Sequence, residues 1–171
     1  MWYFLVILVL MMGMGKAAAE AGESSVIAPS GDAEQVKIEK VEVKLSQLGP
    51  VVILKAQDRS IPIFVDPTVA GSIEGALTGR KFHRPLSHDL MHTILKAYGG
   101  KVDQVVIRLK DQIYYGELTI SLQGQVKVFD SRSSDAIALA IHFHAPILVG
   151  KDLLERAGEP DKPITDPQML L

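Results

Sequence analysis

The sequence has no cysteine among its 171 residues. Disulfide bonds, thiolate zinc sites and cysteine nucleophiles are therefore excluded. It also lacks the Gly-x-x-x-x-Gly-Lys-Ser/Thr phosphate loop, the glycine fingerprint of dinucleotide-binding proteins and the Gly-x-Ser-x-Gly nucleophile elbow. These absences disfavour a nucleotide-driven enzyme.

A strong excess of positive charge is missing as well. Lysine and arginine number 18 against 20 aspartate and glutamate residues, so the formal net charge is -2. A protein that grips nucleic acid over a wide surface needs clustered basic residues, so any such contact here must be local. The segment 79–84 offers a local patch with Arg80, Lys81 and Arg84 around Phe82. A solvated loop explains the same residues.

Long apolar runs are confined to the N-terminus, where residues 1–12 are uncharged and apolar. Small alanines at positions 17, 19 and 21 fit a cleavage site, so residues 1–21 resemble an export signal. Lys16 follows the apolar run instead of preceding it, which leaves an uncleaved membrane tether through residues 2–14 as the alternative. We expect an exported protein, periplasmic or secreted, or a membrane-anchored one. Residues 22–35 read as a flexible linker.

The remaining chain, with 47% hydrophobic and 22% charged residues overall, suits one globular domain at residues 36–157. Alternation of apolar and charged residues predicts a strand over 36–45, and denser apolar runs at 51–56 and 61–65 predict a hairpin. Asp66 and Pro67 suit the N-cap and first position of a helix to about residue 77.

A second helix is predicted over 87–98, before Gly99 and Gly100, and a third over 133–142. Strands are predicted at 102–109, 113–122, 125–129 and 146–149, a helix or turn at 151–158, and a tail at 158–171. Clustered strands with helices between them indicate an α+β fold with a mixed β-sheet packed by helices.

Two polar motifs stand where the chain is expected to enter a helix. They read Arg84-Pro85-Leu86-Ser87-His88-Asp89-Leu90 and Asp130-Ser131-Arg132-Ser133-Ser134-Asp135-Ala136-Ile137-Ala138-Leu139-Ala140. Together with the strands around them, over about residues 51–149, they resemble the bifunctional nuclease (BFN) domain family. The resemblance implies a nuclease acting on DNA and RNA, and a duplicated β-α-β-β arrangement. The family usually has proline where this chain has Ser133.

The residue types in both motifs suit phosphodiester hydrolysis, which needs positive charge on phosphate, an activated water and help for the leaving oxygen. Arg84 and Arg132, with Arg80 and Lys81, are candidates for binding the substrate phosphates. His88 suits a general acid or base. Mg²⁺ or Mn²⁺ prefers carboxylate ligands, for which the candidates are Asp89, Asp130 and Asp135. The predicted catalytic residues are His88, Asp89 and Asp135.

Structural explanations of the same residues remain open. Ser87 suits an N-cap, and an aspartate in a first helical turn is favoured without any catalytic role. Arg132 and Asp135 can pair on one helix face. His88 and His92 superficially resemble a zinc-protease pair, a reading we disfavour, and His142 and His144 suit a helix C-terminus. The competing function is a non-catalytic binding or assembly module, and open sheet edges favour a homodimer in either case.

Overall fold

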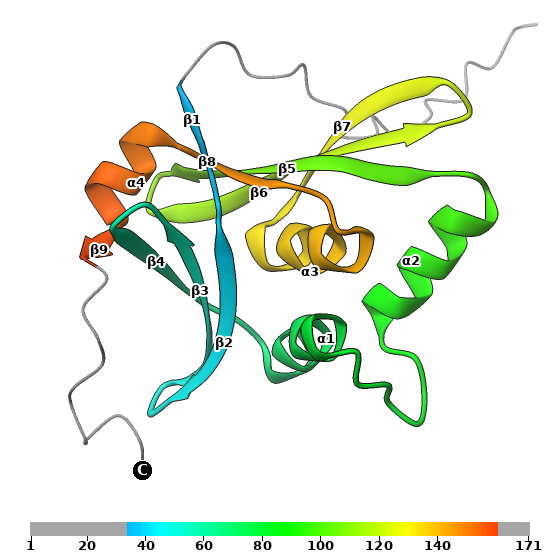
Figure 1. Cartoon of the computed structure of the whole chain (residues 1–171), viewed down its shortest axis with the longest axis horizontal. Coiled ribbons are helices and arrows are strands. Elements are labelled where there is room, and N and C mark those ends of the chain that lie inside the picture. The colour runs from blue at the N-terminus through cyan, green and yellow to red at the C-terminus, as the bar shows by residue number, and fades with distance from the viewer. Residues whose placement is uncertain (1–33, 161–171) are drawn as a thin grey trace, which may run out of the picture.

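The computed structural model describes residues 34–160. These residues form nine strands and four helices (Figure 1). In chain order they are β1 (Gln35–Lys37), β2 (Lys40–Ser46), β3 (Gly49–Ala56), β4 (Arg59–Phe64), α1 (Pro67–Thr78), α2 (Ser87–Ala97), β5 (Lys101–Lys110), β6 (Ile113–Leu122), β7 (Gln125–Arg132), α3 (Ser133–Phe143), β8 (Ile147–Gly150), α4 (Lys151–Ala157) and β9 (Glu159–Pro160).

The strands form two sheets. The larger has the order β1-β8-β5-β6-β7, in which only the β5 and β8 pair is parallel, and the smaller has the antiparallel order β2-β3-β4-β9. The α+β prediction with a mixed sheet is therefore confirmed. The strand pairs β3/β4, β5/β6 and β6/β7 are joined by short turns, as the turn residues between the apolar runs predicted.

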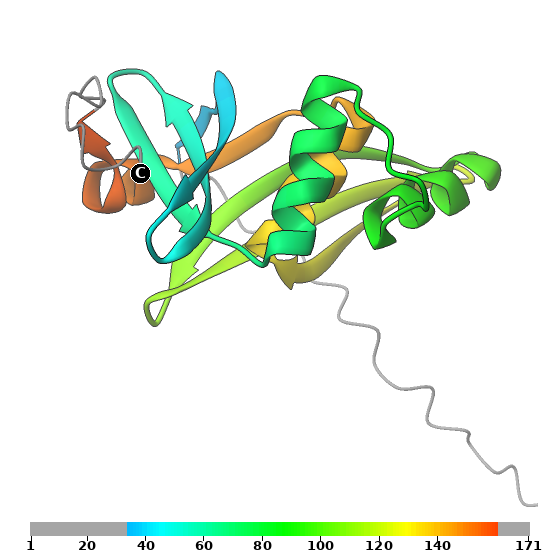
Figure 2. The same ribbon diagram turned by 90° about the horizontal axis from the view of Figure 1, so that it is seen from below.

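Helix α3 lies at the centre of the fold, between β5 and β6 of the larger sheet and helices α1 and α2 (Figures 1 and 2). Its small and apolar residues Ala136 to Ala140 are all buried, because neighbours surround the helix. The approach to the sheet is close, since a Cβ added at Gly116 of β6 would collide with the Cβ of Ala136. Burial of this helix is what places its N-terminal residues against the other elements.

The predicted strand 36–45 is corrected to two strands in different sheets. Ile38 is buried and its N–H donates to the carbonyl of Ile147, whereas the N–H of Glu39 donates to the carbonyl of Lys55 in the smaller sheet. The chain thus crosses between sheets after three residues of β1. The alternation of apolar and charged residues continues where the chain passes from one sheet to the other, so the sequence does not indicate that one strand ends and another begins there.

The repeated order of elements also differs from the expected β-α-β-β arrangement. Three antiparallel strands followed by a helix occur twice, as β2-β3-β4-α1 and as β5-β6-β7-α3. At the domain limits, Gln35 of the predicted linker pairs with Gly150, and Glu159 and Pro160 of the predicted tail pair with β4. Pairing with sheet edges extends the folded domain by these residues.

Several predictions fall on residues outside the described range. They are the export signal at 1–21, the tether at 2–14, most of the linker and residues 161–171. Within residues 34–160, none of the helices has the length and apolar character required to cross a bilayer.

Candidate functional site

The first motif enters helix α2 through Leu86, which is the N-cap residue in place of the predicted Ser87. The carboxylate of Asp89 accepts a hydrogen bond from the backbone N–H of Leu86 at 2.8 Å, so this aspartate closes the first turn. Ser87 is exposed. His88 points the other way and is buried, with 5% of its surface accessible. The capping role weighed for Asp89 is therefore present, and His88 faces the interior.

The second motif has no loop, because β7 runs directly into α3. Asp130, Ser131 and Arg132 are the last residues of the strand, which extends beyond the predicted end at residue 129. Arg132 is also the N-cap residue of α3, where Ser133 and Ser134 are buried. Asp135 follows in the first turn, where the helix dipole favours a carboxylate.

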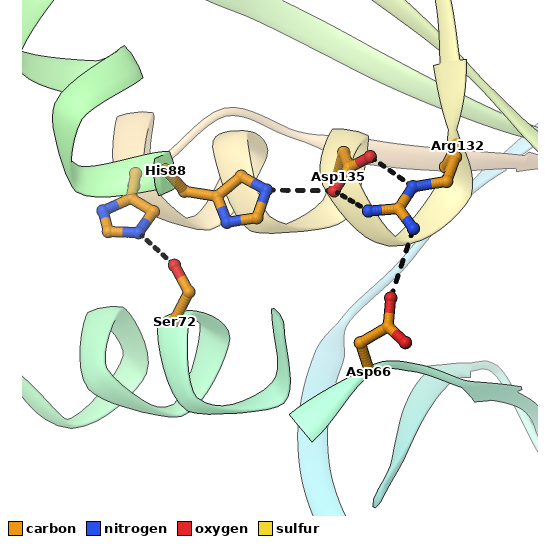
Figure 3. A network of polar contacts seen from close by, with 6 residues as sticks. Asp66, Ser72, His88, Arg132 and Asp135 are labelled. Carbon is orange, nitrogen blue, oxygen red and sulfur yellow. Dashed lines mark hydrogen bonds and ion pairs between the residues drawn. The ribbon is translucent and has the colours of Figure 1, made fainter. Parts of the chain in front are cut away.

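The two helix starts meet in space, as Figure 3 shows. His88 Nε2 lies 3.1 Å from Asp135 Oδ1. Arg132 donates from Nε to Oδ2 and from a terminal nitrogen to Oδ1 of Asp135, at 2.7 and 3.0 Å. The other terminal nitrogen of Arg132 donates to Asp66 Oδ2 at 3.2 Å. We name these four residues, from α2, α3, β7 and the start of α1, the Asp135 cluster.

Electrostatics favour a charged cluster. Burial alone would raise the pKa of the Asp135 carboxyl, but the hydrogen bonds from Arg132 and His88 outweigh burial and hold that pKa below its usual range. The same carboxylate raises the pKa of Arg132. Asp135 is therefore an anion near neutral pH and fixes the orientation of the His88 ring by a short contact.

A second group of polar residues adjoins the cluster. Ser72 of α1 is buried, and its hydroxyl lies 3.1 Å from Nε2 of His142, near the end of α3. Nδ1 of His142 lies 3.9 Å from Asp89 Oδ1, which is too far for a hydrogen bond but close enough for an ion pair if the ring is protonated. Burial lowers the pKa of His142 and outweighs the opposite effect of Asp89.

Four predicted substrate or metal residues lie outside these contacts. Arg80 pairs with Glu74 at 3.0 Å, and its guanidinium lies 5.2 Å from the centre of the Phe82 ring. Lys81 and Arg84 are exposed. Asp130 is exposed on β7, where its register partner is Glu117 of β6. The cluster therefore unites only part of the two motifs.

Of the three carboxylates predicted as metal ligands, Asp89 and Asp135 already contact protein groups, whereas Asp130 is exposed. Both oxygens of Asp135 receive hydrogen bonds, and Asp89 accepts one from Leu86. Over residues 34–160, no three side chains of the His, Asp and Glu types are grouped so that they could hold a metal ion. The Mg²⁺ or Mn²⁺ requirement stays a prediction.

Sequence reasoning did not assign Asp66 and Ser72 to a site. Asp66 is the N-cap residue of α1 with Pro67 next, as predicted, but its side chain makes no cap hydrogen bond and reaches Arg132 instead. An aspartate before a helical proline gives no sign of this second use. Ser72 lies among small residues of α1 and likewise has no distinguishing signal.

The fold and the cluster define a class: an α+β protein of two sheets in which an arginine, a buried histidine and a carboxylate meet at the starts of two helices. Residues 52–162 match the family model for the bifunctional nuclease domain. The chain belongs to the bifunctional nuclease domain family. It is also similar to two uncharacterized proteins from two strains of Mycobacterium tuberculosis, each 29% identical over 127 residues that cover 72% of this chain and 76% of the relative.

Proposed function

We propose that this protein is a nuclease that hydrolyses phosphodiester bonds of DNA, RNA or both at the Asp135 cluster. The observation that supports this most is the contact of His88 with Asp135 beside Arg132, because it joins the two polar motifs in one place. Family membership supports the same reaction class. An arginine and a histidine–carboxylate pair supply phosphate binding and proton transfer, two of the needs of phosphodiester hydrolysis.

Arg132 binds the phosphate. A guanidinium has five N–H donors, of which three are used toward Asp135 and Asp66. Two donors remain for the non-bridging oxygens, and the side chain is 63% exposed, so substrate can reach it. The carboxylates hold the guanidinium plane in place, which lowers the cost of ordering the side chain on binding.

His88 transfers the proton. Its Nε2 faces Asp135, so the nitrogen left for the water or the leaving oxygen is Nδ1. A negative carboxylate on one imidazole nitrogen stabilises the imidazolium that forms when the other nitrogen takes a proton. The ring is only 6% exposed, so a small molecule such as water is the group best able to reach it.

Cleavage of labelled single-stranded DNA, duplex DNA and RNA by the purified full chain tests the proposal. Each substrate is incubated with Mg²⁺, with Mn²⁺ and with a chelator, so metal dependence is measured in the same assay. Asp135→Asn and His88→Gln keep the approximate shape of each side chain, and we expect a rate loss of about 100-fold or more for each. Circular dichroism verifies that both variants fold.

The matched control is Asp111→Asn, the same chemical change in the turn between β5 and β6. Asp111 has a positive φ of 50°, a conformation that asparagine also adopts readily. This variant should cleave like the parent chain. Cleavage that survives Asp135→Asn or His88→Gln unchanged refutes the assignment of the cluster and indicates a contaminating nuclease.

A non-catalytic binding or assembly module is the competing function. Its support is the engagement of every oxygen of Asp135 by protein groups, together with the burial of His88, since both are also features of a purely structural ion pair. In that case the folded chain cleaves no nucleic acid under any of the metal conditions. It either slows the migration of labelled nucleic acid in a gel or self-associates.

We place this activity outside the cytoplasm or at its membrane. The support is the apolar segment at residues 1–12 followed by the alanines at 17, 19 and 21. Mass spectrometry of the chain recovered from an expressing bacterial cell distinguishes a processed exported form from an anchored one of full length.

A further inference from the structure

A pocket of about 280 Å³ opens between the C-terminal ends of α2 and α3. Basic side chains dominate its lining: His92, Lys96, Lys101, His142 and His144. No carboxylate is among the residues that line it. A chain with a net charge of -2 thus places two lysines and three imidazoles, which can take up protons, around one hollow.

The imidazoles are held in place by packing. The ring of His92 lies edge-on to Phe143 at 4.5 Å between ring centres and 5.7 Å from the ring of His142. Ser72 contacts the Nε2 atom of His142, as described above. Two imidazoles at this distance repel each other once both are protonated, so the arrangement favours an anion between or beside them.

Basic residues are common at helix C-termini, where they interact with free carbonyl groups. Here the backbone satisfies several of these carbonyls. The N–H groups of residues 98–100 donate to the carbonyls of Ile94, Leu95 and Lys96, and those of His144 and Ala145 donate to the carbonyls of Ile141 and Ala140. The positive charge of the side chains is therefore not consumed by capping and remains available to a ligand.

Two carboxylates lie near the pocket and limit the charge. Asp89 is 3.9 Å from Nδ1 of His142, and Asp103 pairs with Lys101 at 2.9 Å. Lys96 is exposed in the last turn of α2, one helical turn beyond His92. Lys96 therefore carries the free permanent positive charge of the pocket, and the imidazoles add positive charge only when they are protonated.

We infer that this pocket binds a phosphate group, carried either by a nucleic-acid strand or by free phosphate, through Lys96 and the imidazoles of His92, His142 and His144. The volume accommodates a phosphate with bound water. The pocket lies next to the Asp135 cluster, because His88 and His92 are one turn apart on α2. The site does not require catalysis at that cluster.

Proton uptake accompanies binding. Burial and the neighbouring Lys96 lower the pKa of His92, and burial lowers the pKa of His142 despite Asp89. Both rings are therefore largely neutral in the free protein at neutral pH, and a bound anion favours their protonated forms. The affinity for a phosphodiester, whose charge stays constant over this range, should rise as the pH falls below neutral.

Nuclear magnetic resonance of the imidazole protons of the full chain in a non-ionic detergent tests this inference. The chain has five histidines, which single substitutions assign. The probes are inorganic phosphate and a thymidine dinucleotide whose only phosphate is a diester, each added at constant ionic strength. We expect saturable shifts of His92, His142 and His144, and higher pKa values for His92 and His142 with the probe bound.

Lys96→Gln should weaken binding about tenfold, the usual consequence of losing one charge-assisted hydrogen bond. His144→Asn should also weaken it, and asparagine suits the positive φ of 54° at this position, so the variant is expected to fold. The matched control is Lys127→Gln, which alters an exposed lysine of β7 and should leave the affinity unchanged.

Shifts with the dinucleotide alone assign the pocket to a nucleic-acid strand, and shifts with inorganic phosphate alone assign it to free phosphate. Absence of shifts with both probes overturns the inference. Equal shifts at His83, which lies on the exposed basic loop, also overturn it, because they indicate general attraction and not a pocket. Asp135→Asn should lose cleavage and keep the phosphate shifts, so failure of the proposed function is distinguished from failure of this site.

Discussion

The contact between His88 and Asp135 predicts a measurable coupling energy. A hydrogen bond to a charged group contributes about 1.5–3 kcal/mol when buried. The His88 side chain is 6% exposed and that of Asp135 is 26% exposed, so water weakens the bond and we expect about 1–2 kcal/mol. His88→Ala alone should cost roughly 2–4 kcal/mol, because the buried ring is lost as well. Asp135→Ala alone should cost about 2–3 kcal/mol, since it also leaves Arg132 and His88 without their partner.

Urea unfolding of the parent chain, the two single variants and the double variant gives the coupling energy directly. Circular dichroism is the suitable signal, because the single tryptophan is Trp2, outside the described domain. The control cycle uses Glu34 and Lys151, an exposed ion pair 2.8 Å apart, for which we expect less than about 0.5 kcal/mol. A His88–Asp135 coupling no larger than this control refutes the contact and the cluster built on it.

Three further measurements test the structure. Gly116→Ala should lower the free energy of unfolding by about 1–3 kcal/mol, measured in urea, because its Cβ collides with Ala136; an unchanged stability contradicts the close approach of α3 to the sheet. Because the pKa of His142 is lowered in the folded chain, the unfolded chain takes up that proton first, so stability is complete above the usual value of 6.5 and declines as the pH falls below it. Unfolding measured over this range should show a shallower decline for His142→Asn, and an identical decline contradicts the burial. Since β7 is an edge strand of the larger sheet, we expect a homodimer in sedimentation velocity, and a monomer at every concentration refutes this.

The fold class was predictable because its signals are local. Dense apolar runs separated by turn residues located β3, β4, β5 and β6, and Pro67 located the start of α1. The break at Ile38 was not predictable, because a strand that changes sheets keeps the same alternation of apolar and charged residues. The end of β7 was missed for a related reason: the polar residues 130–132 read as a loop, but pairing with β6 keeps them in the strand.

The types of residue in the site were predictable from the sequence, but which residues meet in the cluster was predictable only in part. His88, Arg132 and Asp135 meet because α2 packs on α3, a contact between segments 47 residues apart that no local pattern specifies. The first-turn position of Asp89 was correctly recognised as compatible with capping, and its carboxylate does bind the backbone of Leu86. Asp66 enters the cluster because the start of α1 faces the end of β7, which only the three-dimensional arrangement reveals.

Because β7 passes directly into α3, the Asp135 cluster should be disrupted only when the domain unfolds. Arg132 is at once the last residue of a paired strand and the N-cap residue of a buried helix. Its backbone cannot open without breaking strand pairing or exposing α3, so local fluctuation of the site alone is suppressed. Amide hydrogen exchange at residues 132–135 should therefore proceed through cooperative unfolding of the domain, and activity and tertiary structure should disappear at the same temperature.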